Sequence, residues 1–177
     1  MIYTPKEDSF LLAEVTKKYS KKKKVLDLGT GSGFLAKISL DAGAKSVLAA
    51  DISQEAVEYA KSQGLNAVQS DLFSNINEKF DLIIFNPPYL PFDSREDEES
   101  RKITTGGEKG DEILLKFFSQ APLYLNENGV ILVVLSSLTP KNRIKNALNK
   151  NNFKFKIVLS KSYFMETLEV WEIKLKP

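Results

Sequence analysis

Four consecutive residues, Asn86-Pro87-Pro88-Tyr89, carry the clearest chemistry in the sequence, and they directly follow an apolar segment, 80–85. Proline lacks a backbone N–H and restricts the residue before it, so the pair stiffens the segment and leaves its carbonyl groups free. The Asn86 side-chain oxygen and the Pro87 carbonyl can each accept one hydrogen of an –NH2 group, while Tyr89 can stack on a planar amide or base. A nitrogen held in this way directs its lone pair at an electrophile. The structural alternative is a loop that only ends a strand.

A glycine-rich segment, 27–33 (Asp-Leu-Gly-Thr-Gly-Ser-Gly), follows an earlier apolar run and precedes a predicted helix. Glycines at such a turn let the backbone approach a ligand closely. The spacing differs from the dinucleotide pattern G-x-G-x-x-G, and a plain tight turn is the alternative. Asp27 beside the turn would repel a pyrophosphate but not the ammonium group of an amino-acid tail.

Acidic residues follow the next two apolar segments, at Asp51 and Asp71. Ligands of open parallel sheets bind at the carboxyl ends of the strands, where an acid accepts hydrogen bonds from ribose hydroxyls. Asp71 could accept a hydrogen bond from an adenine amine, with Ile52 and Leu72 against the two faces of the ring. Each aspartate alone could equally cap a helix or belong to a turn. In succession with the glycine segment, they predict a site for a nucleoside with a tail that is not a phosphate.

Composition excludes several kinds of chemistry. The 177 residues include no cysteine and no histidine, so disulfides, thiol nucleophiles, imidazole bases and Ser-His-Asp triads are excluded, and no metal site is predicted. Lys+Arg (25) nearly balances Asp+Glu (23), and only three residues are arginine, which does not favour readout of nucleic-acid bases. There is no apolar run long enough for a membrane span and no secretory pattern, so we expect a soluble, cytoplasmic protein.

Apolar strand patterns alternate with helical patterns along the chain. The first helix is expected from about Pro5 to Tyr19, with Thr4, Pro5 and Glu7 forming a capping box. The other predicted elements are strands at 25–28, 46–50, 67–69, 80–85, 130–135, 154–159 and 167–175, and helices at 34–41, after Ser53, at 111–125 and at 141–149. This order predicts one α/β domain over residues 1–177, with a mostly parallel sheet, helices on both faces and a terminal antiparallel hairpin.

One segment, 90–110, lacks periodicity and is rich in charge and glycine. Long segments of this kind in compact domains are usually functional lids or mobile loops. Its acidic stretch, at Asp93 and 96–99, would repel phosphates.

These motifs together resemble the class I methyltransferases that recognise amino groups through N-P-P-Y, and most of all the archaeal and eukaryotic HemK-like release-factor glutamine methyltransferases. The segment Tyr3 to Leu12 resembles the family's opening Y-x-P-x-E-D-T/S-F-L-L, 106–110 its G-G-x-x-G segment, and 166–168 its E-T-L. The resemblance covers nearly the whole chain. It implies a Rossmann-like class I methyltransferase domain with a seven-stranded sheet, and S-adenosylmethionine as the cofactor.

The resemblance also assigns roles to residues. For the cofactor it implies Ser9, Asp27, Gly29, Gly31, Gly33, Asp51, Ile52, Asp71, Leu72 and Asn86. For catalysis it implies Asn86, Pro87 and Tyr89, and for substrate binding these three with Pro88. The family acceptor is the glutamine of the Gly-Gly-Gln tripeptide in class I translation termination factors. We expect the chain to lack the N-terminal factor-binding domain of the bacterial relatives, and the resemblance implies that short members of this kind work with a small zinc-binding activator subunit. The weak strand at 66–69 is a plausible edge for that subunit.

Three other functions stay open at this point. A nucleic-acid adenine-N6 or guanine-N2 methyltransferase would also use N-P-P-Y, on a flipped base, but the scarcity of arginine and the acidic stretch oppose it. Related enzymes methylate lysine side chains. A non-catalytic subunit with the same fold is opposed by the intact glycine segment and Asn86.

Overall fold

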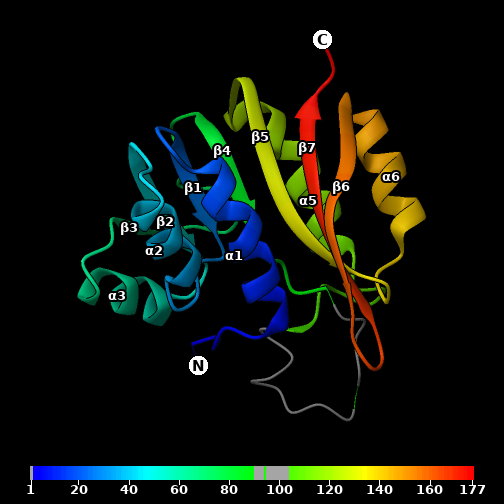
Figure 1. The fold of residues 1–177 in the computed structure, drawn as a ribbon, viewed down its shortest axis with the longest axis horizontal. Helices are drawn as coiled ribbons and strands as arrows, with labels where there is room; N and C mark the ends of the chain where they lie inside the picture. Colours follow the sequence, from blue (N-terminus) through cyan, green and yellow to red (C-terminus); the bar gives the residue numbers. More distant parts are fainter. Residues whose placement is uncertain (1, 90–93, 95–103) are drawn as a thin grey trace.

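A seven-stranded sheet in the order β3-β2-β1-β4-β5-β7-β6 organises the computed structural model, which describes residues 2–89, 94 and 104–177 (Figure 1). Strands β1 to β5 are parallel, whereas β7 runs antiparallel to both β5 and β6. The strands are β1 (Lys24–Leu28), β2 (Ser46–Asp51), β3 (Ala67–Gln69), β4 (Phe80–Phe85), β5 (Leu125–Ser136), β6 (Phe153–Ser162) and β7 (Thr167–Leu175). The helices are α1 (Glu7–Tyr19), α2 (Phe34–Asp41), α3 (Gln54–Ser62), α5 (Glu112–Gln120), the 3₁₀ turn η1 (Ala121–Tyr124) and α6 (Lys141–Lys150).

Each face of the sheet has its own apolar core, because successive residues of a strand point to opposite faces. Leu26 of β1 and Ile83 of β4 pack with residues of α5 and α6. Val25 and Leu82, their neighbours in sequence, pack with residues of α1, α2 and α3 on the other face. The predicted α/β architecture, with a parallel sheet covered on both faces and a terminal antiparallel hairpin, is confirmed.

The register brings the motifs of the sequence to one edge. Leu28 of β1 lies beside Ala50 of β2 and Phe85 of β4, so the glycine segment, Asp51 and Asn86 follow neighbouring strand ends. Because β7 is antiparallel, its first residues lie at this same edge, where Leu168 pairs with Ser136 at the end of β5. The hairpin therefore brings the turn before β7 to the edge where the chemistry was expected.

The predicted capping box at the start of the first helix is wrong. The helix begins at Glu7, two residues later than expected, and its N-cap is Lys6 with an extended backbone and no side-chain cap. The residues before it line a cavity instead of forming a helical turn, and the Tyr3 hydroxyl donates to the Asp8 carboxylate. By contrast, the predicted cap at Ser53 is confirmed, since its Oγ accepts the Ala56 N–H at 3.4 Å.

The largest other differences from the predicted bounds lie at the end of α5 and at the start of β5. The helix expected at 111–125 ends at Gln120 and continues as the 3₁₀ turn η1, because Pro122 has no N–H to continue α-helical bonding. Strand β5 starts at Leu125 instead of Val130, and its pairing with β4 shifts register between Phe80 and Leu82.

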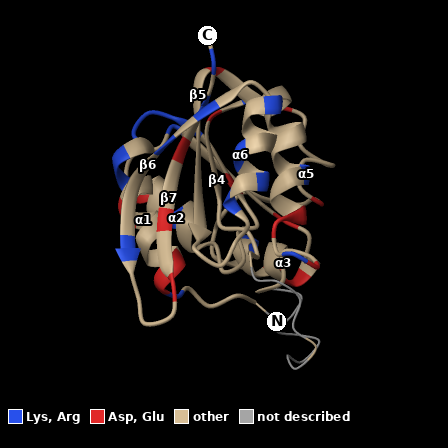
Figure 2. Ribbon diagram, turned by 90° about the vertical axis from the view of Figure 1, so that its right-hand side faces the viewer, with Lys and Arg blue, Asp and Glu red and all other residues tan. Residues whose placement is uncertain are grey.

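Charged residues are mixed over the described part of the chain. Figure 2 shows Lys and Arg interspersed with Asp and Glu on the ribbon, in agreement with the near balance of the two kinds in the sequence. No helix among the described residues has both the length and the apolar character that crossing a membrane requires.

Candidate active site

A cavity of about 810 Å³ opens at the carboxyl edge of the parallel strands. Its walls come from residues before and within the start of α1, the turns after β1 to β4, and the turn between β6 and β7. The predicted site residues that line it are Ser9, Gly29, Gly31, Asp51, Ile52, Asp71, Leu72, Asn86, Pro87, Pro88 and Tyr89. Asp27 and Gly33 are not among the lining residues. The structure thus brings together segments that are far apart in the sequence, and it places two predicted residues behind the wall.

Asp27 lies behind the glycine segment and holds it in place. Its side chain is buried, and Oδ2 accepts hydrogen bonds from the Thr30 hydroxyl at 2.6 Å and from the Ala36 N–H of α2 at 3.0 Å. Its other oxygen, Oδ1, is buried and finds no hydrogen-bond partner among the described residues. Burial raises the pKa of Asp27 to about 7, although the two hydrogen bonds oppose this rise. The carboxylate is therefore costly to ionise unless a positive group approaches it.

Gly33 faces the packed interior and not the cavity. Its backbone is left-handed (φ +75°), and a Cβ at this position would lie 2.5 Å from Leu65 Cδ1. Glycine therefore lets α2 start close against the loop that follows α3.

Asp51 ties the second strand to the glycine segment. Its Oδ2 accepts the Gly31 N–H and its Oδ1 accepts the Ser53 N–H, both at 2.9 Å. Because each carboxylate oxygen has a second lone pair, the side chain can still accept hydrogen bonds from two hydroxyl groups at the cavity.

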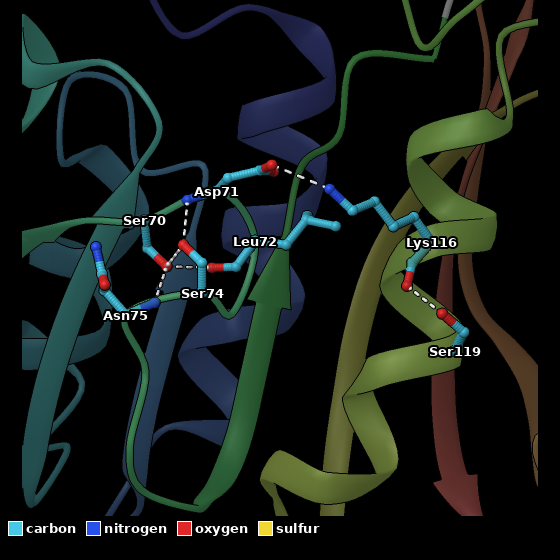
Figure 3. A network of polar contacts seen from close by, with 7 residues as sticks. All are labelled: Ser70, Asp71, Leu72, Ser74, Asn75, Lys116 and Ser119. Carbon is cyan, nitrogen blue, oxygen red and sulfur yellow. Dashed lines mark hydrogen bonds and ion pairs between the residues drawn. The ribbon is translucent and has the colours of Figure 1, made fainter.

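Asp71 has a partner that sequence reasoning missed. Lys116 of α5, which also lines the cavity, places Nζ 3.0 Å from Asp71 Oδ2 (Figure 3). Both side chains are about half exposed, so the ion pair itself adds little stability. The turn that carries Asp71 is fixed separately, because the Ser70 hydroxyl donates to the Leu72 carbonyl at 2.7 Å and accepts the Asn75 N–H at 3.0 Å. No spacing in the sequence pairs residues 45 positions apart.

Asn86 lines the cavity and has one unused side-chain acceptor among the described residues. Its Nδ2 donates to Ser9 Oγ at 3.2 Å, whereas Oδ1 is buried and has no hydrogen-bond partner among the described residues. The side chain of Tyr89 is held at its hydroxyl, which lies 3.3 Å from Asp8 Oδ2. Burial and the nearby negative charge of Asp8 and Glu166 raise the pKa of Tyr89, so its hydroxyl stays protonated.

Three further residues that were not predicted as site residues, Tyr3, Asp8 and Glu166, also line the cavity. Glu166 lies in the turn before β7 and accepts a hydrogen bond from the Ser136 hydroxyl. The sequence did contain a signal for these residues. Tyr3 and Asp8 belong to the opening motif, and Glu166 belongs to the E-T-L segment. Among the described residues, no group of three or more acidic side chains is arranged to hold a metal ion.

The segment 106–110 packs against the proline pair. A Cβ on Gly106 would lie 2.4 Å from the Gly110 carbonyl oxygen and 2.6 Å from that of Pro88. The acidic residues expected to follow Tyr89, at Asp93 and 96–99, lie outside the described residues.

We expect Gly106→Ala to lower the turnover of this site by about 10-fold or more, because the added methyl group must move the Pro88 backbone away from its position. Gly64→Ala is the control away from the cavity: its Cβ position is open, but its left-handed backbone (φ +80°) strains an alanine, so we expect lower stability with unchanged turnover. Both variants should be compared by turnover and by urea unfolding. Equal turnover in the two variants would show that the contact at Pro88 does not matter for activity.

The fold and the cavity define a class: a mostly parallel sheet ending in an antiparallel hairpin, with a nucleoside-sized cavity at its carboxyl edge, is the architecture of class I methyltransferases. The family model described as "Methyltransferase small domain" matches residues 6–165, and the chain belongs to this family.

Similar proteins fall in the same class. A Methanocaldococcus jannaschii protein, MJ0928, provisionally named a protein N5-glutamine methyltransferase, is 40% identical over 164 residues, which cover 88% of this chain and 83% of that protein. The release factor glutamine methyltransferase of Streptococcus pneumoniae is 42% identical over 105 residues, which cover 55% of this chain and 37% of that enzyme. The structure of the E. cuniculi Mtq2–Trm112 complex, described as responsible for methylation of the termination factor eRF1, matches with a TM-score of 0.81 at 25% identity and 99% coverage of both chains.

The family assignment confirms that the chain is a methyltransferase, as the sequence predicted, and with it the prediction of S-adenosylmethionine as the methyl donor. The roles of individual residues toward the cofactor and the acceptor stay predictions.

Proposed function

We propose that the chain transfers a methyl group from S-adenosylmethionine to the side-chain amide nitrogen of a protein glutamine, that of the Gly-Gly-Gln tripeptide in a class I translation termination factor. The observation that carries this proposal is the Asn86 side chain. Its amide oxygen is buried at the cavity without a partner among the described residues, on a segment stiffened by two prolines. The names of the M. jannaschii and S. pneumoniae relatives and the activity ascribed to the Mtq2–Trm112 complex support glutamine as the acceptor.

The cavity suits the cofactor in size and in chemistry. Asp51 keeps free lone pairs for ribose hydroxyls. The Asp27 carboxylate is buried behind the glycine segment, with Oδ1 lacking a partner among the described residues, and it would attract the positive end of the methionine tail through that segment. Ile52 and Leu72 would hold the two faces of adenine, with Asp71 at its amine. When bound, S-adenosylmethionine supplies a methyl group activated by the positive sulfonium.

The residues of the chain would orient the acceptor. Asn86 Oδ1 and the Pro87 carbonyl each accept one N–H of the glutamine amide, and the Tyr89 ring stacks on its plane. Holding both hydrogens directs the nitrogen lone pair out of the amide plane and lowers the loss of resonance on attack. No general base is needed before transfer, because the methylated nitrogen becomes acidic and releases its proton to solvent.

A small partner subunit is part of the proposal, and we infer that it binds zinc and adds to the sheet at β3. This three-residue strand lies at the edge of the sheet, where its outer side has no neighbouring strand among the described residues. The pairing of Mtq2 with Trm112 in the E. cuniculi complex supports a partner chain for this kind of enzyme.

Labelled methyl transfer with competing acceptors tests the proposal. Purified termination factor, its variant with the tripeptide glutamine replaced, ribosomal protein, DNA and tRNA should be compared, each with and without the partner subunit. We expect label on the intact termination factor alone. Ribosomal protein is included because an L11 methylase structure from Lactobacillus delbrueckii subsp. bulgaricus also matches, with 29% identity, a TM-score of 0.69 and coverage of 94% of this chain and 78% of that one. Label on it, or on nucleic acid, instead of on the factor would overturn the acceptor assignment.

Asp51→Ala should weaken binding of S-adenosylmethionine by about 10-fold or more, because hydrogen bonds to a charged group are lost at the ribose. Calorimetric titration measures this effect. Asp41→Ala is the matched control, since Asp41 is exposed at the end of α2 and does not line the cavity. Unchanged affinity in the Asp51 variant would remove the ribose assignment.

A further inference from the structure

The buried carboxylate of Asp8, at the start of α1, accepts hydrogen bonds from the N-terminal segment and from the proline motif. Asp8 is only 6% exposed, and its oxygens accept the Tyr3 hydroxyl at 2.8 and 2.9 Å and the Tyr89 hydroxyl at 3.3 Å. The same carboxylate accepts the Ser9 N–H at 2.6 Å and the Ser9 hydroxyl at 3.2 Å. The start of α1 is thus joined to a residue of the proline motif that lies 81 positions away in the sequence.

The direction of these hydrogen bonds is fixed by the charge on Asp8. An ionised carboxylate can only accept, so the Ser9 hydroxyl must donate its single hydrogen to it. Ser9 Oγ can then only accept from its other neighbour, Asn86, which lies 3.2 Å away at Nδ2. The Asn86 amide must therefore turn its NH2 toward Ser9 and leave Oδ1 free at the cavity.

We propose that Asp8 is a positioning residue, which acts through the Ser9 hydroxyl to fix the Asn86 amide with its oxygen toward the acceptor. The inference rests on the proposed role of Asn86 in holding the acceptor –NH2. It gives Ser9 a role in addition to the cofactor contact predicted for it. In this account the Asp8 carboxylate determines the orientation of the Asn86 amide without contacting the substrate amide itself.

The substitution Asp8→Ala removes the acceptor that holds the Ser9 hydrogen. That hydrogen becomes free to turn to Asn86 Oδ1 and occupy the acceptor that substrate needs. We expect kcat to fall by about 100-fold, as for loss of a positioned hydrogen-bond partner, while the affinity for S-adenosylhomocysteine changes by less than about 3-fold. Adding Ser9→Ala to Asp8→Ala should recover about 10-fold of kcat, because the misdirected hydrogen is gone.

Glu172→Ala is the matched control. Glu172 is also a buried carboxylate, 6% exposed, that accepts a tyrosine hydroxyl, that of Tyr19, but it does not line the cavity. This variant should keep its kcat even if its thermal midpoint falls. A loss of kcat in both variants alike would show that removing any such buried charge disturbs the enzyme.

A readout independent of the acceptor is the side-chain amide signal of Asn86 in asparagine-labelled protein, assigned by its absence in Asn86→Ala. In Asp8→Ala the two NH2 resonances should shift and exchange faster with water, and in Glu172→Ala they should not. Unchanged Asn86 signals together with kcat within about 3-fold of the wild type would overturn the proposal.

The two proposals fail in different ways. If the wild-type enzyme labels no glutamine, the acceptor assignment is wrong, but the Asn86 signals still decide the role of Asp8. If Asp8→Ala does not fold, Ser9→Ala alone should shift the Asn86 NH2 signals and speed their exchange with water, while Asp8 stays in place. Unaltered signals in that variant would also contradict the relay.

Discussion

Asn86→Ala is expected to reduce methyl transfer by about 100-fold or more while leaving the affinity for S-adenosylmethionine nearly unchanged, because it removes an acceptor that acts on the reacting nitrogen. The buried Oδ1 atom is free of protein partners among the described residues, so its removal leaves no unsatisfied donor that could account for a structural effect. Single-turnover kinetics with saturating cofactor measure the loss directly.

Asn126→Ala provides the comparison for this variant. Asn126 also uses its amide NH2 within the protein, on Asp81 at 2.9 Å, but it lies outside the cavity. Its replacement should leave turnover close to the wild-type value. Near-normal turnover in Asn86→Ala would exclude the role assigned to this residue.

Asp27→Asn is expected to remove a large part of the pH dependence of folding stability. The pKa of Asp27 is about 7 in the folded protein, against about 3.9 in an unfolded chain. Between these values the folded state holds a proton that the unfolded state has lost, so the free energy of unfolding falls as the pH rises. The slope is about 1.4 kcal/mol per pH unit, and the total loss reaches at most about 4 kcal/mol above pH 7.

Urea unfolding of both proteins at pH 5 and pH 8, without cofactor, measures this difference. The absence of histidine makes the window favourable, because no imidazole titrates there. The wild type should be less stable at pH 8 than at pH 5 by more than the variant is. Any loss of stability that the Asp27→Asn substitution causes equally at both pH values cancels, because each protein is compared with itself at pH 5 and pH 8. The same pH dependence in both proteins would mean that the Asp27 carboxylate is ionised throughout.

Much of the fold could be predicted because the local sequence pattern agrees with the secondary structure that each segment adopts in the folded domain. Strands such as 67–69 and 80–85 were predicted with their observed bounds, since turn residues and apolar runs mark them. The start of α1 was missed because a capping-box pattern describes local hydrogen bonding only. Here the segment before Glu7 serves a distant cavity instead.

The candidate site could be predicted to the extent that strand ends meet at one edge. The glycine segment, Asp51, Asp71 and Asn86 each lie at or just after the end of a strand, so topology alone places them together. The pairs Lys116–Asp71 and Asp8–Tyr89 depend on how side chains cross the cavity, and no periodicity encodes such contacts. Burial, which decides the ionisation of Asp27, likewise emerges only after packing.

The position of β7 between β5 and β6 has a consequence for how ligand binding and folding are linked. Glu166 and Leu168 line the cavity, yet they reach it only when this strand has inserted into the sheet. Occupancy of the cavity and assembly of the whole domain therefore form one cooperative unit, and saturating ligand should raise the melting temperature of the entire chain in a single transition.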